Sequence, residues 1–349
     1  MSRQRALPRV VQFEWKLVLA GAGPGLQIRR EAPGRRLRWV RLPLASAGCL
    51  PRREAPPHNR PLIDLHAHTT ASDGALTPAE LIAAALELGL EALAITDHDT
   101  LAGYEQAKPL AEEEGLELVC AVEVSARFRR PAMPRSRGAH LLGYFLGQPP
   151  GDEFRRWLEG FEQRRAERNQ RLAARLRDLG LQVTLQEAAA HGRRLTGRVH
   201  FAQVLVSKGY AGSIAEAFRL YLGESGRAYV PLERVELAEA IGKVRAAGGL
   251  PSLAHPGRLK HDLEPGLGEL CAQGLSGLEA YSSEHSPAET ALFLDLARRY
   301  DLVVTGGSDF HGETKPGVRL GSGLNGNLAV PREVLEGMRR RAQQLSLAG

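Results

Sequence analysis

The 349-residue sequence has little cysteine and no long apolar run. Its three cysteines, Cys49, Cys120 and Cys271, stand far apart and form no CxxC pair, which argues against a cysteine-based zinc site and favours a reduced compartment. No uninterrupted run of about 18 apolar residues is present, so no membrane span is predicted. We therefore expect a cytoplasmic protein that is not bound to a membrane, and no obligate protein partner is evident from the sequence.

The net charge of +6 is distributed unevenly along the chain. Residues 1–60 hold twelve Arg and one Lys against three Glu, a net +10, whereas the rest holds 33 basic and 37 acidic residues, a net −4. The high pI therefore belongs to the N-terminal segment. That segment is either a basic arm for RNA or another polyanion, or a disordered extension, or the product of a start site assigned too far upstream.

From residue 61 onward, short β-like runs alternate with amphipathic helical segments, a pattern typical of an α/β fold with a parallel sheet wrapped by helices. Three helix starts have a hydroxyl three residues before a glutamate, at Thr77, Ser213 and Ser286. Seven strands are predicted, at residues 62–65, 92–96, 116–122, 140–145, 250–254, 277–281 and 302–305. Polar side chains follow each strand within a few residues, at the edge where active sites of such sheets lie.

Residues 150–235 interrupt this alternation with a long, charged segment of helical period, followed by two further helical stretches. This segment divides the chain into a first barrel part (61–149), a helical insertion (150–235) and a second barrel part (236–349). We expect the insertion to cover the barrel mouth as a lid, although an ordinary exposed helical bundle would have the same pattern.

Six histidines and four acids gather near the predicted strand ends. "DLHAHTTASDG" contains His66, His68 and Asp73, and the other members are Asp97, His98, Glu123, His140, His255, Asp309 and His311. Burying so many ionisable groups without partners would cost several kcal/mol each, whereas divalent cations would satisfy them. Imidazole and carboxylate without thiolate suit Zn²⁺, Mn²⁺ or Fe²⁺, and ten candidates fit two or three ions that share a bridging carboxylate.

The segments "DLHAHTTASDG", "ITDHD", "LAHPGR" and "GGSDFHG" resemble the four motifs of the PHP (polymerase and histidinol phosphatase) family of metal-dependent phosphoesterases. The resemblance covers roughly residues 61–325. It implies a distorted seven-stranded (β/α)7 barrel, in agreement with the seven predicted strands.

The resemblance also implies three metal sites. The first set is His66, His68, Glu123 and Asp309; the second is Glu123, His140 and His255; the third is Asp73, His98 and His311. Family members often carry histidine where Asp73 stands. Asp97 has no ligand role in this scheme, and we expect it either to orient a ligating imidazole or to make a structural hydrogen bond.

"LTGRVHFAQVL" and "ESGRAYVP" resemble segments of the PHP subgroup that removes the 5′-phosphate from nucleoside 3′,5′-bisphosphates and trims short RNA from the 5′ end. The resemblance implies that Arg198 and Arg227 bind the second phosphate, with His200 close by. Arg258, with Ser283 or His285, is expected to line the pocket. Either His200 or His285 is a candidate to protonate the leaving group, and a metal-bridged hydroxide would be the nucleophile.

Two other functions fit the same residues. Within the enzyme class, the substrate could instead be histidinol phosphate or another small phosphomonoester. In a different class, the metal cluster would only stabilise a non-catalytic module, but that arrangement normally goes with missing ligands, and every motif position here holds a competent side chain.

Overall fold

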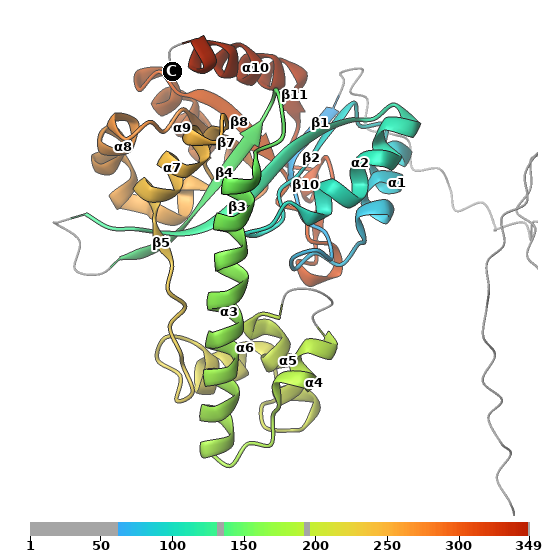
Figure 1. Cartoon of the computed structure of the whole chain (residues 1–349), viewed down its shortest axis with the longest axis vertical. Helices are drawn as coiled ribbons and strands as arrows, with labels where there is room; N and C mark the ends of the chain where they lie inside the picture. The colour runs from blue at the N-terminus through green and yellow to red at the C-terminus, as the bar shows by residue number, and fades with distance from the viewer. Residues whose placement is uncertain (1–61, 131–135, 192–195, 348–349) are drawn as a thin grey trace, which may run out of the picture. The chain divides into compact units, whose positions relative to one another are not determined.

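The computed structural model describes residues 62–130, 136–191 and 196–347 (Figure 1). The basic segment predicted at 1–60 lies outside these residues. Across the described ranges, no helix combines the length and apolar character that crossing a membrane requires. The division of the chain at residues 150 and 235 stays a prediction.

A nearly closed sheet of eight strands forms the centre of the fold, and their order is β11-β1-β2-β3-β4-β6-β7-β8. All seven predicted strands are present, and β11 pairs antiparallel with β1. A short strand, β5 (Val235–Glu236), pairs with β3, and β9 (Val318–Arg319) forms a separate hairpin with β10 (Gly323–Leu324). The eight strands are β1 (Leu62–Ala67), β2 (Ala92–Ile95), β3 (Glu117–Phe128), β4 (Arg137–Phe145), β6 (Leu250–Leu253), β7 (Gly277–Ser282), β8 (Val303–Gly307) and β11 (Val330–Pro331).

Helices pack around this sheet and also form the insertion between β4 and β5. The helices around the sheet are α1 (Pro78–Glu87), α2 (Ala102–Glu114), α7 (Leu237–Ala246), α8 (Leu263–Ala272), α9 (Pro287–Arg299) and α10 (Arg332–Leu347), with 3₁₀ turns η2 (Pro256–Asp262) and η3 (Gly312–Thr314). The insertion holds α3 (Asp152–Asp178), α4 (Leu185–His191), α5 (Arg198–Ser207), α6 (Ile214–Ala217) and the π-helical turn η1 (Phe218–Leu222).

The sheet is mixed, so the expectation of an all-parallel sheet was wrong at β4. Strand β4 runs antiparallel to both β3 and β6, because residues 129–136 are too few to return the chain through a crossover helix. Strand β3 also continues six residues beyond its predicted end at Val122. Glu123 and His140 therefore lie within paired strands and not in loops after them.

The barrel closes where β1 meets the chain that follows β8. The Asp309 N–H donates to the His66 carbonyl at 2.8 Å, and the His68 N–H donates to the Phe310 carbonyl at 2.9 Å. The buried carboxylate of Asp64 accepts hydrogen bonds from the N–H groups of Ser308 (2.9 Å) and Gly321 (2.8 Å), which fixes the same join. A Cβ atom at Gly307 would lie 2.2 Å from the His66 nitrogen, so only glycine permits this approach.

Helix α3 joins the barrel to the insertion (Figure 1). Its first half contributes Phe154, Leu158 and Phe161 to the main core cluster, and its second half contributes Leu172 and Leu176 to a separate cluster formed with α5 and its neighbours. Within each half these residues are three or four positions apart, and the eleven positions between Phe161 and Leu172 are about three helical turns, so all five lie on one stripe along the helix. The insertion thus has a core of its own while α3 anchors it to the barrel.

The predicted helix starts are confirmed. Thr77 and Ser286 form complete capping boxes with Glu80 and Glu289, as the sequence pattern indicates. Ser213 accepts from the Glu216 N–H at 3.1 Å, but the Glu216 carboxylate accepts from Gly212 in place of Ser213. Each cap fixes the point where a loop ends and a helix begins.

We expect Gly307→Ala to lower the free energy of unfolding by about 1–3 kcal/mol, because the new methyl group would collide with the β1 backbone. Urea denaturation of both proteins measures this loss. Gly147→Ala is the matched control, since no described atom lies within 4 Å of a Cβ built there. Equal losses in the two variants would show that the close approach of β1 and β8 does not limit stability.

Candidate metal centre

The carboxylate of Glu123, which is 1% exposed, lies at the centre of the site. A ring nitrogen from each of five imidazoles lies between 2.8 and 3.3 Å from one of its oxygens: His140, His255, His68, His66 and His98. Strands β1, β3 and β4 and the segments after β1, β2 and β6 supply these residues. The barrel therefore brings together side chains that are far apart in the sequence.

Two further carboxylates extend the cluster to both sides. Asp309 Oδ1 lies 3.4 Å from His66 Nε2, 3.3 Å from His68 Nε2 and 3.4 Å from His311 Nδ1. Asp73 Oδ1 lies 3.3 Å from His311 Nε2, and Asp73 Oδ2 lies 3.7 Å from His98 Nε2. All nine residues expected as metal ligands thus lie in one continuous cluster.

Three groups of these side chains have the spacing that a metal ion requires. One group has the same members as the first expected set, and another joins His68 to the third expected set of Asp73, His98 and His311. The remaining group holds His98, Glu123 and His140. His255, expected in the second set, is absent from that group, although its Nε2 lies 2.9 Å from Glu123 Oε1.

The buried atoms of the cluster fit a metal better than they fit one another. His66 Nε2, His68 Nε2, His98 Nδ1 and Glu123 Oε2 are buried and form no hydrogen bond with any described residue. The three nitrogens nevertheless surround Glu123 Oε2 at 3.1–3.3 Å. Unsatisfied buried polar atoms are costly, and cations bound by the groups to which these atoms belong would satisfy them.

The electrostatics of the cluster also suit cations. Burial alone would raise the pKa of Glu123, but the imidazoles of His140 and His98 hold it well below the usual range. Burial would lower the pKa of His68, but the carboxylates of Asp309 and Glu123 raise it to about 10. Burial lowers the pKa of His98 to about 4. The carboxylates of the cluster thus favour the ionised form, and a cation would compete with the proton for His68.

The backbone is strained at three positions in this cluster. Asp99, Asp309 and His255 have positive φ angles of 58°, 54° and 25°, a region that residues other than glycine seldom occupy. Asp309 and His255 are expected ligands, and Asp99 follows one directly. Strain of this kind persists only where the surrounding structure imposes it, and it concentrates at functional sites.

Glu279 supports two of the expected ligands and was not among the predicted site residues. Its Oε1 lies 2.7 Å from His66 Nδ1, and its Oε2 accepts from the His255 N–H at 2.5 Å. A carboxylate behind a ligating imidazole fixes the ring and its tautomer. The sequence contained a signal, because Glu279 is the one charged residue in the otherwise uncharged β7 run "GLEAYS".

Asp97 is buried and contacts the expected ligand His68 only indirectly. Its carboxylate accepts from the Thr69 N–H and hydroxyl at 2.8 and 2.7 Å, and from the Ser72 hydroxyl at 2.6 Å. The Ser72 hydroxyl lies 3.4 Å from His68 Nδ1. The geometry therefore combines the two expectations for Asp97: it holds the loop after β1, and it reaches His68 through Ser72.

A chamber of about 310 Å³ opens beside the cluster, and Arg258 and Lys315 lie in its wall. Lys315 Nζ lies 2.7 Å from Asp309 Oδ2 and 2.8 Å from Glu284 Oε1. Arg258 Nε donates to Glu284 Oε2 at 2.8 Å. Lys315 was not predicted, and a single lysine in a loop gives no sequence signal. We call this space the imidazole chamber.

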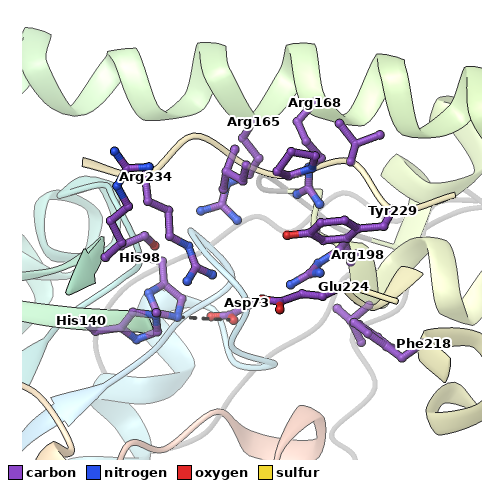
Figure 2. Close-up of a pocket in the computed structure, with 18 of the residues that line it drawn as sticks. Asp73, His98, His140, Arg165, Arg168, Arg198, Phe218, Glu224, Tyr229 and Arg234 are labelled. Atoms are coloured by element: carbon purple, nitrogen blue, oxygen red, sulfur yellow. Dashed lines mark ion pairs between the residues drawn. The ribbon is translucent and has the colours of Figure 1, made fainter. Parts of the chain in front are cut away.

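A second chamber, of about 430 Å³, shares Asp73, His98 and His140 with the first. Six arginines line it: Arg127 and Arg137, which pair with Glu236 and Asp262, and a group of four, Arg165, Arg168, Arg198 and Arg234. Figure 2 shows Arg165 and Arg168 reaching from α3 into this space, with Arg198 and Tyr229 alongside. We call it the arginine chamber. Phosphate groups are natural ligands for such a concentration of planar cations.

Arg168 is the most buried of the four, at 3% exposure, and its Nε has no hydrogen-bond partner. Among the described residues, it forms no ion pair with an acid. Burial first, and then the charges of Arg165 and Arg198, lower its pKa to about 9. Arg165 and Arg168 continue the α3 stripe, occupying positions between Phe161 and Leu172 where the spacing would otherwise place apolar side chains.

The other predicted site residues divide between the chambers and the surrounding protein. Arg198 and His200 line the arginine chamber, and Arg258 lines the imidazole chamber. Arg227 lines neither. The Ser283 hydroxyl donates to the Ser308 carbonyl at 2.7 Å, and His285 Nδ1 donates to the Ala280 carbonyl at 3.0 Å; neither side chain lines a chamber.

Comparison with known proteins shows which family of proteins this chain resembles. The PHP domain family model matches residues 64–223. The chain is 32% identical to a 5′-3′ exoribonuclease of Haemophilus influenzae, with 71% of this chain and 89% of that protein covered. It is 32% identical to a 3′,5′-nucleoside bisphosphate phosphatase of Chromobacterium violaceum (74% and 90% covered). It is 37% identical to a phosphoribosyl 1,2-cyclic phosphate 1,2-diphosphodiesterase of Eggerthella lenta (72% and 94% covered).

A solved structure agrees with these relatives. A putative metal-dependent phosphoesterase from Bifidobacterium adolescentis superposes with a TM-score of 0.68 at 31% identity, covering 80% of this chain and 96% of that one. The barrel fold, the cluster of histidines and carboxylates, and the similarity to these proteins together define a metal-dependent phosphoesterase. The chain belongs to the PHP domain family.

We expect Glu279→Gln to weaken metal binding about 10- to 100-fold, because the amide cannot hold His66 and the His255 backbone as the carboxylate does. Titration calorimetry with Mn²⁺ or Zn²⁺ measures the change. Glu264→Gln, at an exposed ion pair with Arg299, is the control. Unchanged metal affinity in Glu279→Gln would mean that Glu279 does not orient the ligands.

Proposed function

We propose that the protein removes the 5′-phosphate from nucleoside 3′,5′-bisphosphates and trims short RNA from its 5′ end. The observation that carries the proposal is the continuity of the two chambers, which share Asp73, His98 and His140. One phosphate can react beside the cluster while a second is bound by arginines. The names of the Haemophilus and Chromobacterium relatives point to the same substrates.

The proposal includes two or three divalent ions, of Mn²⁺, Zn²⁺ or Fe²⁺, held by the three expected ligand sets. Ions bound there would lower the pKa of a water molecule and neutralise charge on the phosphoryl oxygens. Glu123 would be the shared ligand, since both of its oxygens face imidazoles. Glu279 would keep His66 oriented, and Asp97 would hold the His68 loop.

The chain's own cations would position the substrate. Arg258 and Lys315, next to Asp309, would contact the reacting phosphate, while Arg198 and Arg168 would bind the second one. His200 is better placed than His285 to approach the leaving group, because only His200 lines a chamber. The Gly197 N–H donates to His200 Nδ1 at 2.9 Å, so the proton of the neutral ring lies on Nε2, ready to donate.

The substrate assignment is tested by comparing kcat/KM for four compounds: adenosine 3′,5′-bisphosphate, a 5′-phosphorylated short RNA, histidinol phosphate and phosphoribosyl 1,2-cyclic phosphate. We expect either of the first two to exceed the last two by at least about tenfold, since only they combine a 5′-phosphate with a second phosphate on the 3′-oxygen for the arginine chamber. Asp309→Asn should abolish turnover, which shows that the activity belongs to this chain. A preference for histidinol phosphate or the cyclic phosphate would overturn the assignment.

We expect Arg168→Gln to lower kcat/KM for adenosine 3′,5′-bisphosphate about 10- to 100-fold, as loss of a charge-assisted hydrogen bond predicts. The value for adenosine 5′-monophosphate, which lacks the second phosphate, should change little. Arg171→Gln, an exposed position on the same helix, is the matched control. Equal losses for both nucleotides would remove Arg168 from second-phosphate binding.

A further inference from the structure

Asp99 connects three parts of the molecule through one buried carboxylate, which is 2% exposed. It directly follows His98 in the loop after β2. Its Oδ1 accepts from the Ser125 N–H of β3 at 2.7 Å, and its Oδ2 accepts from Arg165 Nη2 of α3 at 2.7 Å. The metal-binding loop, the strand that carries Glu123 and the insertion helix therefore meet at this side chain.

The contact with Arg165 has a consequence for the arginine chamber. Arg165, Arg168, Arg198 and Arg234 carry like charges, which favours the escape of any flexible guanidinium toward solvent. Asp99 opposes this for Arg165, because it binds one edge of the guanidinium in a buried ion pair. Arg165 lines the chamber, and its Nε is buried with no hydrogen-bond partner among the described residues, so this donor is unused within the protein.

We propose that Asp99 is a positioning residue for the substrate: it holds the Arg165 guanidinium in the arginine chamber, at a fixed place relative to the loop that carries His98. The proposal rests on the proposed function, since it takes this chamber as the binding place of the second phosphate. Asp99 acts through Arg165 and touches neither substrate nor metal.

The substitution Asp99→Asn separates this role from simple support of the loop. Asparagine keeps an oxygen that accepts from the Ser125 N–H, and it tolerates the positive φ of 58° at this position. It lacks the charge that holds Arg165, and its amide N–H groups would face another donor. The loop should therefore remain in place while Arg165 loses its anchor.

The first measurement is calorimetric binding of adenosine 3′-monophosphate, the expected product, which carries only the second phosphate. We expect Asp99→Asn to raise its Kd about tenfold, with metal content unchanged. In turnover of adenosine 3′,5′-bisphosphate, KM should rise by a similar factor while kcat changes less than about twofold.

The second measurement is a double-mutant cycle with Arg165→Gln. If Asp99 acts through Arg165, the double variant binds adenosine 3′-monophosphate no more weakly than Arg165→Gln alone. Glu153→Gln is the control, because Glu153 forms an exposed ion pair with Lys243 that also joins α3 to the barrel. Its Kd should equal that of the wild type.

The outcomes separate this proposal from the proposed function. If the increases in Kd caused by Asp99→Asn and Arg165→Gln multiply in the double variant, the role of Asp99 alone is overturned. A fall in kcat and metal content with Kd unchanged would have the same meaning. A wild-type protein that binds adenosine 3′-monophosphate but prefers to hydrolyse histidinol phosphate would overturn the reaction and leave the positioning role standing. Failure of the wild type to bind adenosine 3′-monophosphate would overturn both.

Discussion

The carboxylate of Glu123, surrounded by five imidazoles, is the constraint on which the rest of the site depends. Burying such a set costs several kcal/mol per charge unless the partners are held in good geometry. The nearly closed barrel supplies that geometry, because β1, β3 and β4 point their side chains at one rim. Asp64 and Gly307, at the join between β1 and β8, are therefore as necessary to the cluster as the ligands themselves.

Much of the barrel and of the cluster was predictable because the signals are local. Each strand is a short apolar run, and each ligand lies in or beside one, so the seven strands and the nine clustered side chains followed from pattern and resemblance. The antiparallel direction of β4 was not predicted, because strand direction depends on the length of a connection and not on the strand's own residues. Glu279 was missed although its isolated charge within a buried strand was visible.

The arginine chamber was harder to predict because its signal is not local. Helix α3 contains many arginines, and nothing in the composition distinguishes Arg165 and Arg168 from exposed ones such as Arg171. The distinction lies in the position around the helix axis. Arg165 and Arg168 continue the stripe formed by Phe154, Leu158, Phe161, Leu172 and Leu176. Whether such a position is buried depends on which barrel residues lie opposite it; here Asp99 pairs with Arg165, and Ser125 lines the same chamber.

Along the buried stripe of α3, the apolar residues stabilise the fold, and the two arginines between them line the ligand chamber. The apolar residues on either side of the two arginines anchor the helix in two different cores, so the segment between them is held from both ends. Exchanging residues 165 and 168 would leave the apolar contacts of both anchors in place, while loss of Arg165 would leave the Asp99 carboxylate without its ion-pair partner. A change of two codons would alter the charge of the chamber while the scaffold persists, which makes this short interval the natural place for ligand preference to diverge among descendants of the same barrel.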